Sequence, residues 1–404
     1  MPKKALIIGF GVSGKASAAL LQKQGWDVIA IDRNAPAMQG QSVLVFDENA
    51  SLDLTSFSLV VISPGIPSTH KWILAALEKK IEVIGEIELA FRYTENRCIG
   101  VTGTNGKTTT TLLIEHVLNA SGLPARSVGN IGLALSDYLL KPNLQEILVV
   151  ELSSFQLETL AAKKLDAAVY LNLTPDHLDR YATLSDYAKA KARIQDCLKP
   201  GGRLFVSEQV ARDYGDLFHP EITSVFSPGP SHAGALASQN YDAAHEAVSF
   251  FGISSSAFVE AFKSFQKPSH RIEWVSEING VQYYDDSKGT NIDAVIHAMT
   301  LFNKPIVLIA GGVDKGASYA PWIESFRSKV RLIVAYGQAA SKMERELSSF
   351  FPFVKVELFK EAVALAKKEA KRGEVVLLSP GCSSFDQHRN YAHRGDEFKQ
   401  MVMR

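Results

Sequence analysis

Residues 98–109 read CIGVTGTNGKTT, a short apolar run followed by a glycine-rich loop and a lysine where a helix would begin. Backbone N–H groups of such a loop cradle phosphates, the lysine adds a point charge, and the next hydroxyl can ligate Mg²⁺. A cation at a helix start is unfavourable without an anion, so a purely structural loop is disfavoured. The spacing departs from GxxxxGKT, because Val101 stands where the first glycine belongs. We expect phosphate contacts from Gly103, Thr104, Asn105, Gly106, Lys107, Thr108 and Thr109.

Two polar groups follow farther along the same part of the chain. Glu151 comes directly after the apolar run 147–150, where a strand-end carboxylate could ligate Mg²⁺, although an acid near a helix start is the simpler alternative. Residues 175–180 read PDHLDR. His177 alone would more often be structural, but beside a Mg²⁺–ATP site a ligand or phosphate contact is favoured. Lys191, taken alone, is typical of a solvated charge on a helix face.

A second glycine motif lies near the N-terminus. Residues 9–14 read GFGVSG, directly after the apolar run 5–8 and before a helical pattern, and Asp32 ends the next apolar run. This is the fingerprint of a dinucleotide-binding turn, which predicts a nucleotide-like ligand; a tight strand–helix turn is the alternative. A further turn, Ser63-Pro64-Gly65-Ile66, follows the fourth strand, where ligands of open α/β folds bind, or is an ordinary Pro-Gly turn.

Polar loops also follow the strands of the C-terminal third. His270-Arg271 precedes DDSKGTN at 285–291, a group that we interpret as too polar for a core and as able to steady phosphates. GGVDKG at 311–316 and SPGCSSFDQ at 379–387 come after apolar runs, and either one in isolation is consistent with a flexible turn.

Apolar runs alternate with helical patterns along the whole chain, which favours parallel sheets covered by helices. Strands are expected at 5–8, 28–31, 43–46, 59–62, 83–84, 97–101, 146–151, 167–172, 203–206, 273–275 and 281–285, and near 305, 330 and 375. Helices are expected at 15–24, 69–80, 110–119, 184–198 and 241–265, with a loop at 226–239. We place domain boundaries near Tyr93 and Pro268.

Composition narrows the functional classes. The 404 residues carry 43 basic and 43 acidic side chains, a balance that argues against a polybasic nucleic-acid binder. No apolar run approaches the length of a membrane span, and the first one ends at Gly9, too early for a signal peptide. Three widely spaced cysteines fit neither a disulfide framework nor a metal site. We expect a soluble cytoplasmic protein.

Together these motifs resemble those of the Mur ligases. TGTNGKTT is similar to the ATP loop that this family shares with folylpolyglutamate synthetases, while ELSSFQLE, NLTPDHLDRY, DDSKGTN and LLSPGCSSFDQHRNYAHRGDEF resemble the member that adds D-glutamate. The resemblance implies an α/β fold of three domains. These are a Rossmann-like UDP-binding domain at 1–93, a central ATPase domain with a mainly parallel sheet at 94–267, and a Rossmann-like domain at 268–404 that closes on ATP and binds D-glutamate.

The resemblance also implies residue roles. UDP-side positions are Gly11, Val12, Ser13, Asp32, Arg33, Ser63 and Gly65, with Asn130, Ser153 and His177 near the muramoyl substrate. Metal positions are Thr108, Glu151, His177 and a carbamylated Lys191. Catalytic and ATP-side positions are Lys107, His177, Lys191, His270, Arg271, Asp286, Lys288 and Lys315. D-glutamate positions are Lys315, Ser384, Phe385 and Tyr391.

The implied activity is ATP- and Mg²⁺-dependent addition of D-glutamate to UDP-N-acetylmuramoyl-L-alanine by a monomer, without nucleic-acid or membrane partners. The alternatives are another Mur-type or folylpolyglutamate-type ligase, an NAD-dependent dehydrogenase and a non-catalytic ATP-binding module. The chain departs from relatives in two places. Ala243 replaces an asparagine that approaches the nucleotide, and the stretch between Lys191 and Asn240 is short, which puts the adenine contacts in question.

Overall fold

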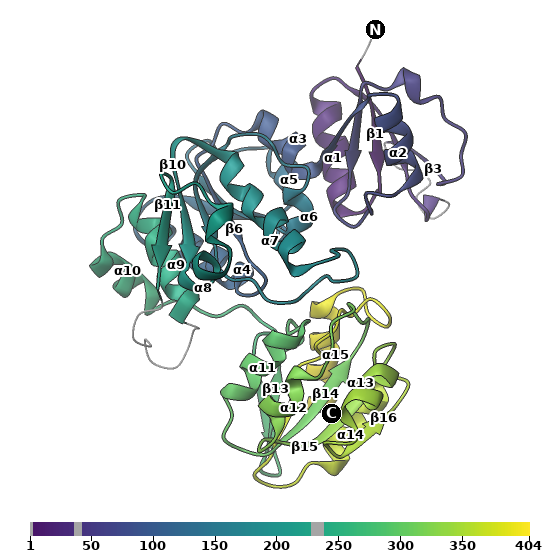
Figure 1. The fold of residues 1–404 in the computed structure, drawn as a ribbon, viewed down its shortest axis with the longest axis vertical. Coiled ribbons are helices and arrows are strands. Elements are labelled where there is room, and N and C mark those ends of the chain that lie inside the picture. The colour runs from purple at the N-terminus through teal and green to yellow at the C-terminus, as the bar shows by residue number, and fades with distance from the viewer. Residues whose placement is uncertain (1–2, 36–42, 228–237) are drawn as a thin grey trace. The chain divides into compact units, whose positions relative to one another are not determined.

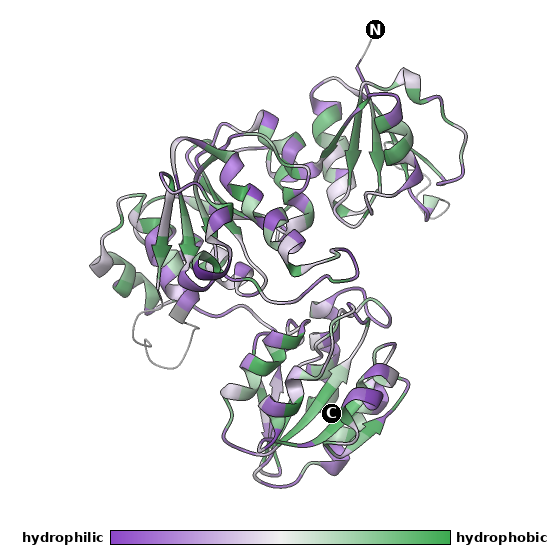
Figure 2. Cartoon of the chain, viewed as in Figure 1, coloured by the Kyte–Doolittle hydropathy of each residue, from purple (hydrophilic) through white to green (hydrophobic). Residues whose placement is uncertain are grey.

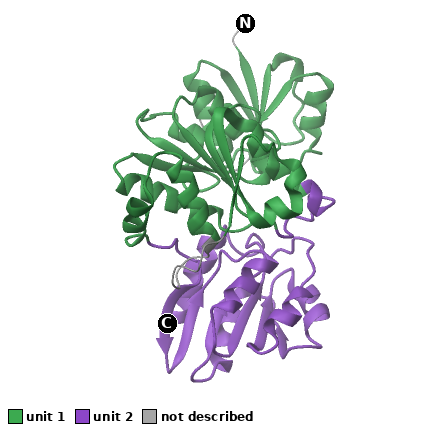
Figure 3. Ribbon diagram, turned by 60° about the vertical axis from the view of Figure 1, so that its left-hand side comes forward, with its two compact units in different colours: residues 1–173, 187–265 green, residues 174–186, 266–404 purple. Residues whose placement is uncertain are grey.

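The computed structural model describes residues 3–35, 43–227 and 238–404. Three sheets, flanked by helices, make up the fold (Figure 1), which confirms the predicted α/β class. The chain divides into two compact units, the first made of residues 1–173 and 187–265 and the second of residues 174–186 and 266–404 (Figure 3). The predicted domain limits stay predictions.

The first sheet is parallel, with the strand order β3-β2-β1-β4-β5 of a mononucleotide-binding fold. Its strands are β1 (Lys4–Ile8), β2 (Asp27–Ile31), β3 (Leu44–Phe46), β4 (Leu59–Ile62) and β5 (Glu82–Gly85). Its helices are α1 (Val12–Lys23), α2 (Lys71–Glu78) and α3 (Glu86–Tyr93), with the short turn η2 (Leu54–Ser56). Leu6, Ile8 and Val60 pack against Trp72 and Ile73 of α2, because alternate strand residues face one side of a sheet.

The second sheet is parallel throughout, in the order β11-β10-β9-β6-β8-β7. Its strands are β6 (Cys98–Thr102), β7 (Ala125–Gly129), β8 (Ile147–Glu151), β9 (Leu165–Tyr170), β10 (Leu198–Ser207) and β11 (Thr223–Phe226). The accompanying helices are α4 (Lys107–Ala120), α5 (Leu135–Tyr138), α6 (Ser154–Leu157), α7 (Leu184–Ala192), η3 (Arg193–Cys197), α8 (Glu208–Tyr214), η4 (Gly215–Leu217), α9 (Ser238–Ser249) and α10 (Ser255–Phe262).

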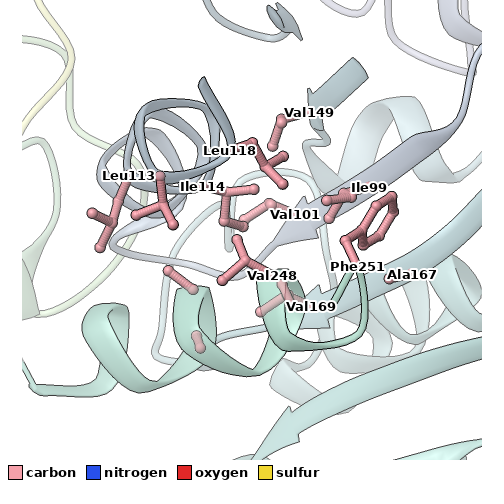
Figure 4. Packing of buried hydrophobic residues seen from close by; sticks show 14 of the residues in the cluster. Ile99, Val101, Leu113, Ile114, Leu118, Val149, Ala167, Val169, Val248 and Phe251 are labelled. Atoms are coloured by element: carbon pink, nitrogen blue, oxygen red, sulfur yellow. The ribbon is translucent and has the colours of Figure 1, made fainter. Parts of the chain in front are cut away.

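The apolar core that covers the second sheet holds the start of α4 in place. Leu113, Ile114 and Leu118 of α4 pack in one buried cluster with Ile99 and Val101 of β6 (Figure 4). All five side chains are fully buried, and each such burial contributes about 1.5–3 kcal/mol relative to exposure. The glycine-rich loop joins these two elements, so its backbone is anchored at both ends.

The third sheet, in the order β12-β13-β17-β14-β15-β16, is parallel except where β12 pairs with β13. Its strands are β12 (Glu273–Ile278), β13 (Val281–Asp285), β14 (Ile306–Gly311), β15 (Val330–Tyr336), β16 (Phe353–Lys355) and β17 (Val375–Leu378). Its helices are α11 (Ile292–Thr300), α12 (Pro321–Phe326), α13 (Ala340–Leu347), α14 (Phe359–Glu369) and α15 (Tyr391–Met403). Helices cover both faces, and the central strands are correspondingly apolar along their length (Figure 2).

Two predicted helices are wrong in extent. The pattern expected at 241–265 is interrupted, because Gly252 takes a φ of +89° between α9 and α10. The helix expected at 184–198 ends at Ala192 and continues as the 3₁₀ segment η3. The predicted loop at 226–239 falls mostly at 228–237, outside the described residues. Among the described helices, none has the length and apolar character that crossing a membrane requires.

Candidate active site

The glycine-rich loop lies at the carboxyl end of β6 and opens α4, as predicted. Gly106 precedes the helix with a φ of +82°, and a side chain there would collide with Asn240, so only glycine fits. Among the described residues, no side chain caps this helix start. The first-turn N–H groups of α4 therefore form an anion-binding end.

Asn172 braces this loop and was missed from the sequence. Its Oδ1 accepts the N–H of Asn105 at 2.8 Å, and its Nδ2 donates to the Asn105 carbonyl at 3.0 Å. Its own carbonyl accepts the N–H of Thr104 at 2.9 Å. Its position after the carboxyl end of β9, the neighbour of β6 in the sheet, is the sequence feature that could have identified it.

Two ammonium groups converge on one carbonyl of the loop. Lys107 Nζ donates to Gly103 O at 2.9 Å and to Thr104 O at 2.8 Å, while Lys191 Nζ donates to the same Gly103 O at 2.8 Å. Lys191 is only 1% exposed, so its interpretation as a solvated charge is wrong. It lies four residues after buried Tyr187 and three before buried Ile194, on the apolar face of α7. This helical spacing could have predicted its burial. Like charges this close favour an anion or the loss of one charge.

Glu151 ends β8 beside this loop. Its Oε2 accepts the hydroxyl of Thr108 at 2.8 Å, and its Oε1 accepts Nδ2 of Asn130 at 2.9 Å. Thr108 and Glu151 are both buried. A hydroxyl and a carboxylate are hard oxygen donors, so this pair fits Mg²⁺ by its chemistry. The structure thus brings together three predicted residues from three separate segments.

Two other predicted positions have local roles in this unit. The hydroxyl of Ser153 accepts the N–H of Gln156 and caps the short helix α6. Ala243 is fully buried in the core of the second sheet, whereas Asn240, one turn earlier on α9, lies beside Gly106. The amide of Asn240 therefore lies next to the glycine-rich loop.

The N-terminal glycine motif also forms at the carboxyl edge of its sheet. Asp32 Oδ2 accepts the N–H of Phe10 at 2.7 Å, and Ser63 Oγ donates to Gly9 O at 2.8 Å, so the two predicted turns are in contact. Gly14 is required for packing, because a Cβ there would overlap the carbonyl of Gly9. The remaining predicted residues, Gly11, Val12, Ser13, Arg33 and Gly65, lie on the same turns, with Val12 78% exposed at the start of α1.

In the second unit, the backbone around Arg271 is strained. His270 and Ile272 have φ values of +63° and +52°, a left-handed conformation that costs on the order of 1–3 kcal/mol for each such residue. Buried carboxylates hold this turn. His270 Nδ1 lies 2.6 Å from Asp285 Oδ2, and the N–H of Ile272 donates to Asp286. Strain retained by surrounding structure is typical of functional positions.

The DDSKGTN group is more buried than predicted. Asp285, Asp286 and Ser287 are at most 5% exposed, so the interpretation as too polar for a core is wrong. Hydrogen bonds compensate their burial, including one of 2.6 Å from Ser379 Oγ to Asp286 Oδ2. Burial raises the pKa of Asp286 to about 7, although Ser379 and the Arg271 guanidinium oppose that shift.

Asp286→Asn should stabilise the ligand-free protein above neutral pH. The pKa of Asp286 is raised in the folded state, so its carboxyl stabilises the folded protein below the unfolded-state pKa of 3.8. This contribution to stability is lost as the pH rises through about 7. The difference in unfolding free energy between variant and wild type should therefore grow between pH 4 and pH 8, by on the order of 4 kcal/mol. Thermal unfolding at several pH values measures this difference. The control Glu324→Gln alters an exposed ion pair of the same unit and should give a nearly constant difference.

Lys315 forms an ion pair with the buried Asp176 in the second unit. Its Nζ lies 3.0 Å from Asp176 Oδ1, and Nδ2 of Asn291 lies 3.3 Å from Asp176 Oδ2. Burial raises the pKa of Asp176, but Lys315, His177 and the hydrogen bonds outweigh it and leave that pKa below its usual value. His177 follows directly, with a φ of +56°. The segment 174–186 thus belongs by its contacts to the second unit.

Of the residues predicted for D-glutamate, Lys315 lies on the loop after β14, and the other three lie on the loop after β17 and on the helix that follows it. Ser384 is buried, Phe385 is 73% exposed, and Tyr391 begins α15. The Lys288 ammonium lies 3.9 Å from the centre of the Tyr391 ring, a cation–π contact. Val313 pairs with Ser383, which ties the Lys315 loop to the Ser384 loop. The structure therefore brings together Lys288, Lys315 and Ser384 on neighbouring loops and Tyr391 at the start of α15.

His270, Glu273 and Asp285 also form a cluster whose ligand atoms lie within 4.8 Å of one another. Lys399 Nζ lies 2.8 Å from Glu273 Oε2 and 3.9 Å from Asp285 Oδ2. An ammonium therefore already balances the negative charge of this cluster.

Family models match three parts of the chain. The model described as "Mur ligase MurD-like, N-terminal domain" matches residues 3–85, the "Mur ligase middle domain" residues 101–265, and the "Mur ligase, glutamate ligase domain" residues 270–382.

Curated relatives match nearly the whole chain. A UDP-N-acetylmuramoylalanine–D-glutamate ligase of Protochlamydia amoebophila is 46% identical, with 99% of this chain and 98% of that protein covered. The enzyme of the same name from Chlamydia trachomatis is 34% identical, with the same shares covered. Among solved structures, a MurF ligase of Thermotoga maritima in complex with ADP is similar in fold. It has a TM-score of 0.62 and 16% identity, with 100% of this chain and 95% of that chain covered.

Proposed function

The chain belongs to the Mur ligase family, and from this premise we propose that it joins D-glutamate to UDP-N-acetylmuramoyl-L-alanine while ATP is converted to ADP and phosphate. It is an ATP-dependent ligase. The observation that carries the substrate assignment is the match of relatives with that name over 99% of this chain, one of them at 46% identity. The family assignment leaves no basis for the dehydrogenase alternative.

The reaction needs ATP because a carboxylate is a poor electrophile and oxide is a poor leaving group. In the proposed first step, a carboxylate oxygen of the substrate's L-alanine attacks the γ-phosphorus, and the bond from that phosphorus to the bridging oxygen of ADP breaks. In the second step, the amine of D-glutamate attacks the acyl carbon. The resulting tetrahedral intermediate loses phosphate, the nitrogen loses a proton, and an amide remains.

The first step brings two anions together, which costs about 4 kcal/mol at ~4 Å in a moderately screened site. We assign the offsetting charges to Lys107 in the phosphate loop and to Arg271 in the second unit. The N-terminus of α4 supports the same role, because its first-turn N–H groups carry partial positive charge. His270, Asp286 and Lys288 are assigned to the ATP side of the second unit.

Mg²⁺ would be held by Thr108 and Glu151, whose oxygens meet at 2.8 Å, with His177 as a further proposed ligand. When bound, it would supply positive charge that polarises phosphoryl oxygens. Asn130 holds the second Glu151 oxygen and so keeps the first one directed at Thr108.

We propose that Lys191 is carbamylated. The Lys191 ammonium would first lose a proton, and the neutral amine would then attack CO₂ to form a nitrogen–carbon bond. The nitrogen would lose a second proton, so that a cation is replaced by an anion. The support is the shared Gly103 carbonyl, since removal of one of the two ammonium charges relieves their repulsion.

Activity should therefore fall when CO₂ is removed from the buffer and return when bicarbonate is added. With ¹³C-bicarbonate, a carbamate signal should appear by NMR in the wild type and in Lys189→Gln, an exposed lysine of the same helix. The signal should be missing in Lys191→Gln. A carbamate signal that persists in Lys191→Gln would refute the assignment.

The UDP part of the substrate is assigned to the first sheet, at Gly11, Val12, Ser13, Asp32, Arg33, Ser63 and Gly65. Asn130, Ser153 and His177 are assigned to the muramoyl part. The D-glutamate carboxylates are assigned to Lys315, Ser384, Phe385 and Tyr391 of the second unit. We place the enzyme in the cytoplasm, because ATP and UDP-linked precursors are made there.

Phosphate release with UDP-N-acetylmuramoyl-L-alanine, ATP and Mg²⁺ tests this function. Release should require D-glutamate, and L-glutamate should give little phosphate. Only one enantiomer of the amino acid places the amine and both carboxylates next to their partners. Release with a different amino acid and not with D-glutamate would show another ligase of the family. Release without any amino acid would contradict ligation.

A further inference from the structure

Arg394 is a buried charged group, and no charged side chain in the described part of the chain accepts a hydrogen bond from it. It is 0% exposed, and all four acceptors of its guanidinium are uncharged oxygens. Nε donates to Ser287 Oγ at 2.9 Å, and one Nη donates to Ser287 O at 2.8 Å and Cys382 O at 3.2 Å. The other Nη donates to the hydroxyl of Tyr336 at 3.2 Å. Burial of a cation costs free energy of folding, so stability alone does not explain an arginine at this position.

The acceptors belong to three separate segments of the second unit. Ser287 follows β13, Cys382 follows β17, and Tyr336 ends β15, while Arg394 itself lies on α15. Ser287 Oγ also donates to the carbonyl of Tyr391 at 2.8 Å, which completes a chain of hydrogen bonds from Arg394 through Ser287 to Tyr391. One guanidinium therefore fixes the turn after β13, the loop after β17 and the start of α15 relative to one another.

Residues assigned to the two substrates lie next to these contacts. Lys288, on the ATP side, directly follows Ser287, and its ammonium lies over the ring of Tyr391, on the D-glutamate side. Ser384 comes two residues after Cys382. A small displacement of the guanidinium would thus move groups for both substrates together.

We propose that Arg394 is a positioning residue that couples the ATP-side turn at 285–291 to the D-glutamate-side residues Ser384 and Tyr391. The inference rests on the proposed function. Arginine suits this role because its donors lie in one rigid plane and reach four acceptors at once, whereas a lysine ammonium has three rotating donors and no fork.

The test is steady-state kinetics of Arg394→Lys with each substrate varied in turn. The KM values for ATP and for D-glutamate should both rise about tenfold, while the KM for UDP-N-acetylmuramoyl-L-alanine should stay unchanged, because its residues lie elsewhere. Arg331→Lys is the matched control. Arg331 donates to Glu369 O and forms an ion pair with Glu374 at the amino-terminal edge of the same sheet, so its replacement should lower stability and leave all three KM values unchanged.

Ser287→Ala keeps the test decisive if Arg394→Lys does not fold. It removes the link from Arg394 to Tyr391 and should raise the KM for D-glutamate. The double variant should raise that KM no more than Arg394→Lys alone, because both changes break the same chain of hydrogen bonds.

Three outcomes separate the possibilities. Unchanged KM values in folded Arg394→Lys or Ser287→Ala, with only a lower melting temperature, would mean a purely structural role and would overturn the inference. Fold-changes that multiply in the double variant would also overturn it. Failure of the wild type to release phosphate with D-glutamate would instead refute the proposed function.

Discussion

Lys107→Ala is expected to lower ADP formation about 10³-fold, the size of effect seen when one preorganised charge or donor is removed from a transition state. Lys107 begins α4 and is held over the phosphate loop by the carbonyls of Gly103 and Thr104. Without its ammonium, the γ-phosphoryl group would gain negative charge with one fewer cation. A coupled assay of ADP formation with all substrates measures the loss.

The matched control for this variant is Lys164→Ala. Lys164 also donates to a backbone carbonyl, that of Thr94 at 2.8 Å, but it precedes β9 and so lies at the amino-terminal edge of the same sheet. Its replacement should leave ADP formation near that of the wild type. Full turnover by folded Lys107→Ala would contradict the assignment of the phosphate loop.

Glu151→Gln is expected to lower turnover about 10²-fold or more and to raise the Mg²⁺ concentration needed for half-maximal rate. The change keeps the shape of the side chain and removes its charge. It also turns an amide N–H₂ group toward either Thr108 or Asn130, both of which donate to the native carboxylate. Rates measured over a range of Mg²⁺ concentrations separate weaker metal binding from a slower step.

Glu146→Gln controls for the loss of one carboxylate near β8. Glu146 comes immediately before this strand and pairs with Arg126 at 3.0 Å, whereas Glu151 ends it. Its variant should keep the Mg²⁺ dependence of the wild type. If Glu151→Gln does the same, Glu151 is not a metal ligand.

The sequence predicted those parts of the fold in which one local pattern determines one element. The apolar run 59–62 matches β4 in extent, because buried parallel strands need continuous apolar residues. The predicted strand 281–285 matches β13, whose residues alternate between buried and half-buried. The edge strands β7, β11 and β16 were missed, since they are short and include polar side chains such as Arg126, Ser224 and Lys355. The break between α9 and α10 depends on the backbone of Gly252, which helical periodicity does not reveal.

The site was predictable where its chemistry is local and hidden where it depends on distant residues. The glycine-rich loop and the strand-end Glu151 could be located from neighbouring residues alone. The hydrogen-bond partners of Lys191 and Asp286 could not, because Gly103 and Ser379 are 88 and 93 residues away in the chain. Asn172 and Arg394 form hydrogen bonds with backbone N–H and carbonyl groups, and a single sequence does not reveal such partners.

The most direct test of the account follows the oxygen that the acyl phosphate would carry. UDP-N-acetylmuramoyl-L-alanine labelled with ¹⁸O in its alanine carboxylate is incubated with ATP, Mg²⁺ and D-glutamate, and the released phosphate is analysed by mass spectrometry. Transfer of the γ-phosphoryl group to this carboxylate predicts one labelled oxygen in each phosphate. Amide formation accompanied by unlabelled phosphate would contradict it.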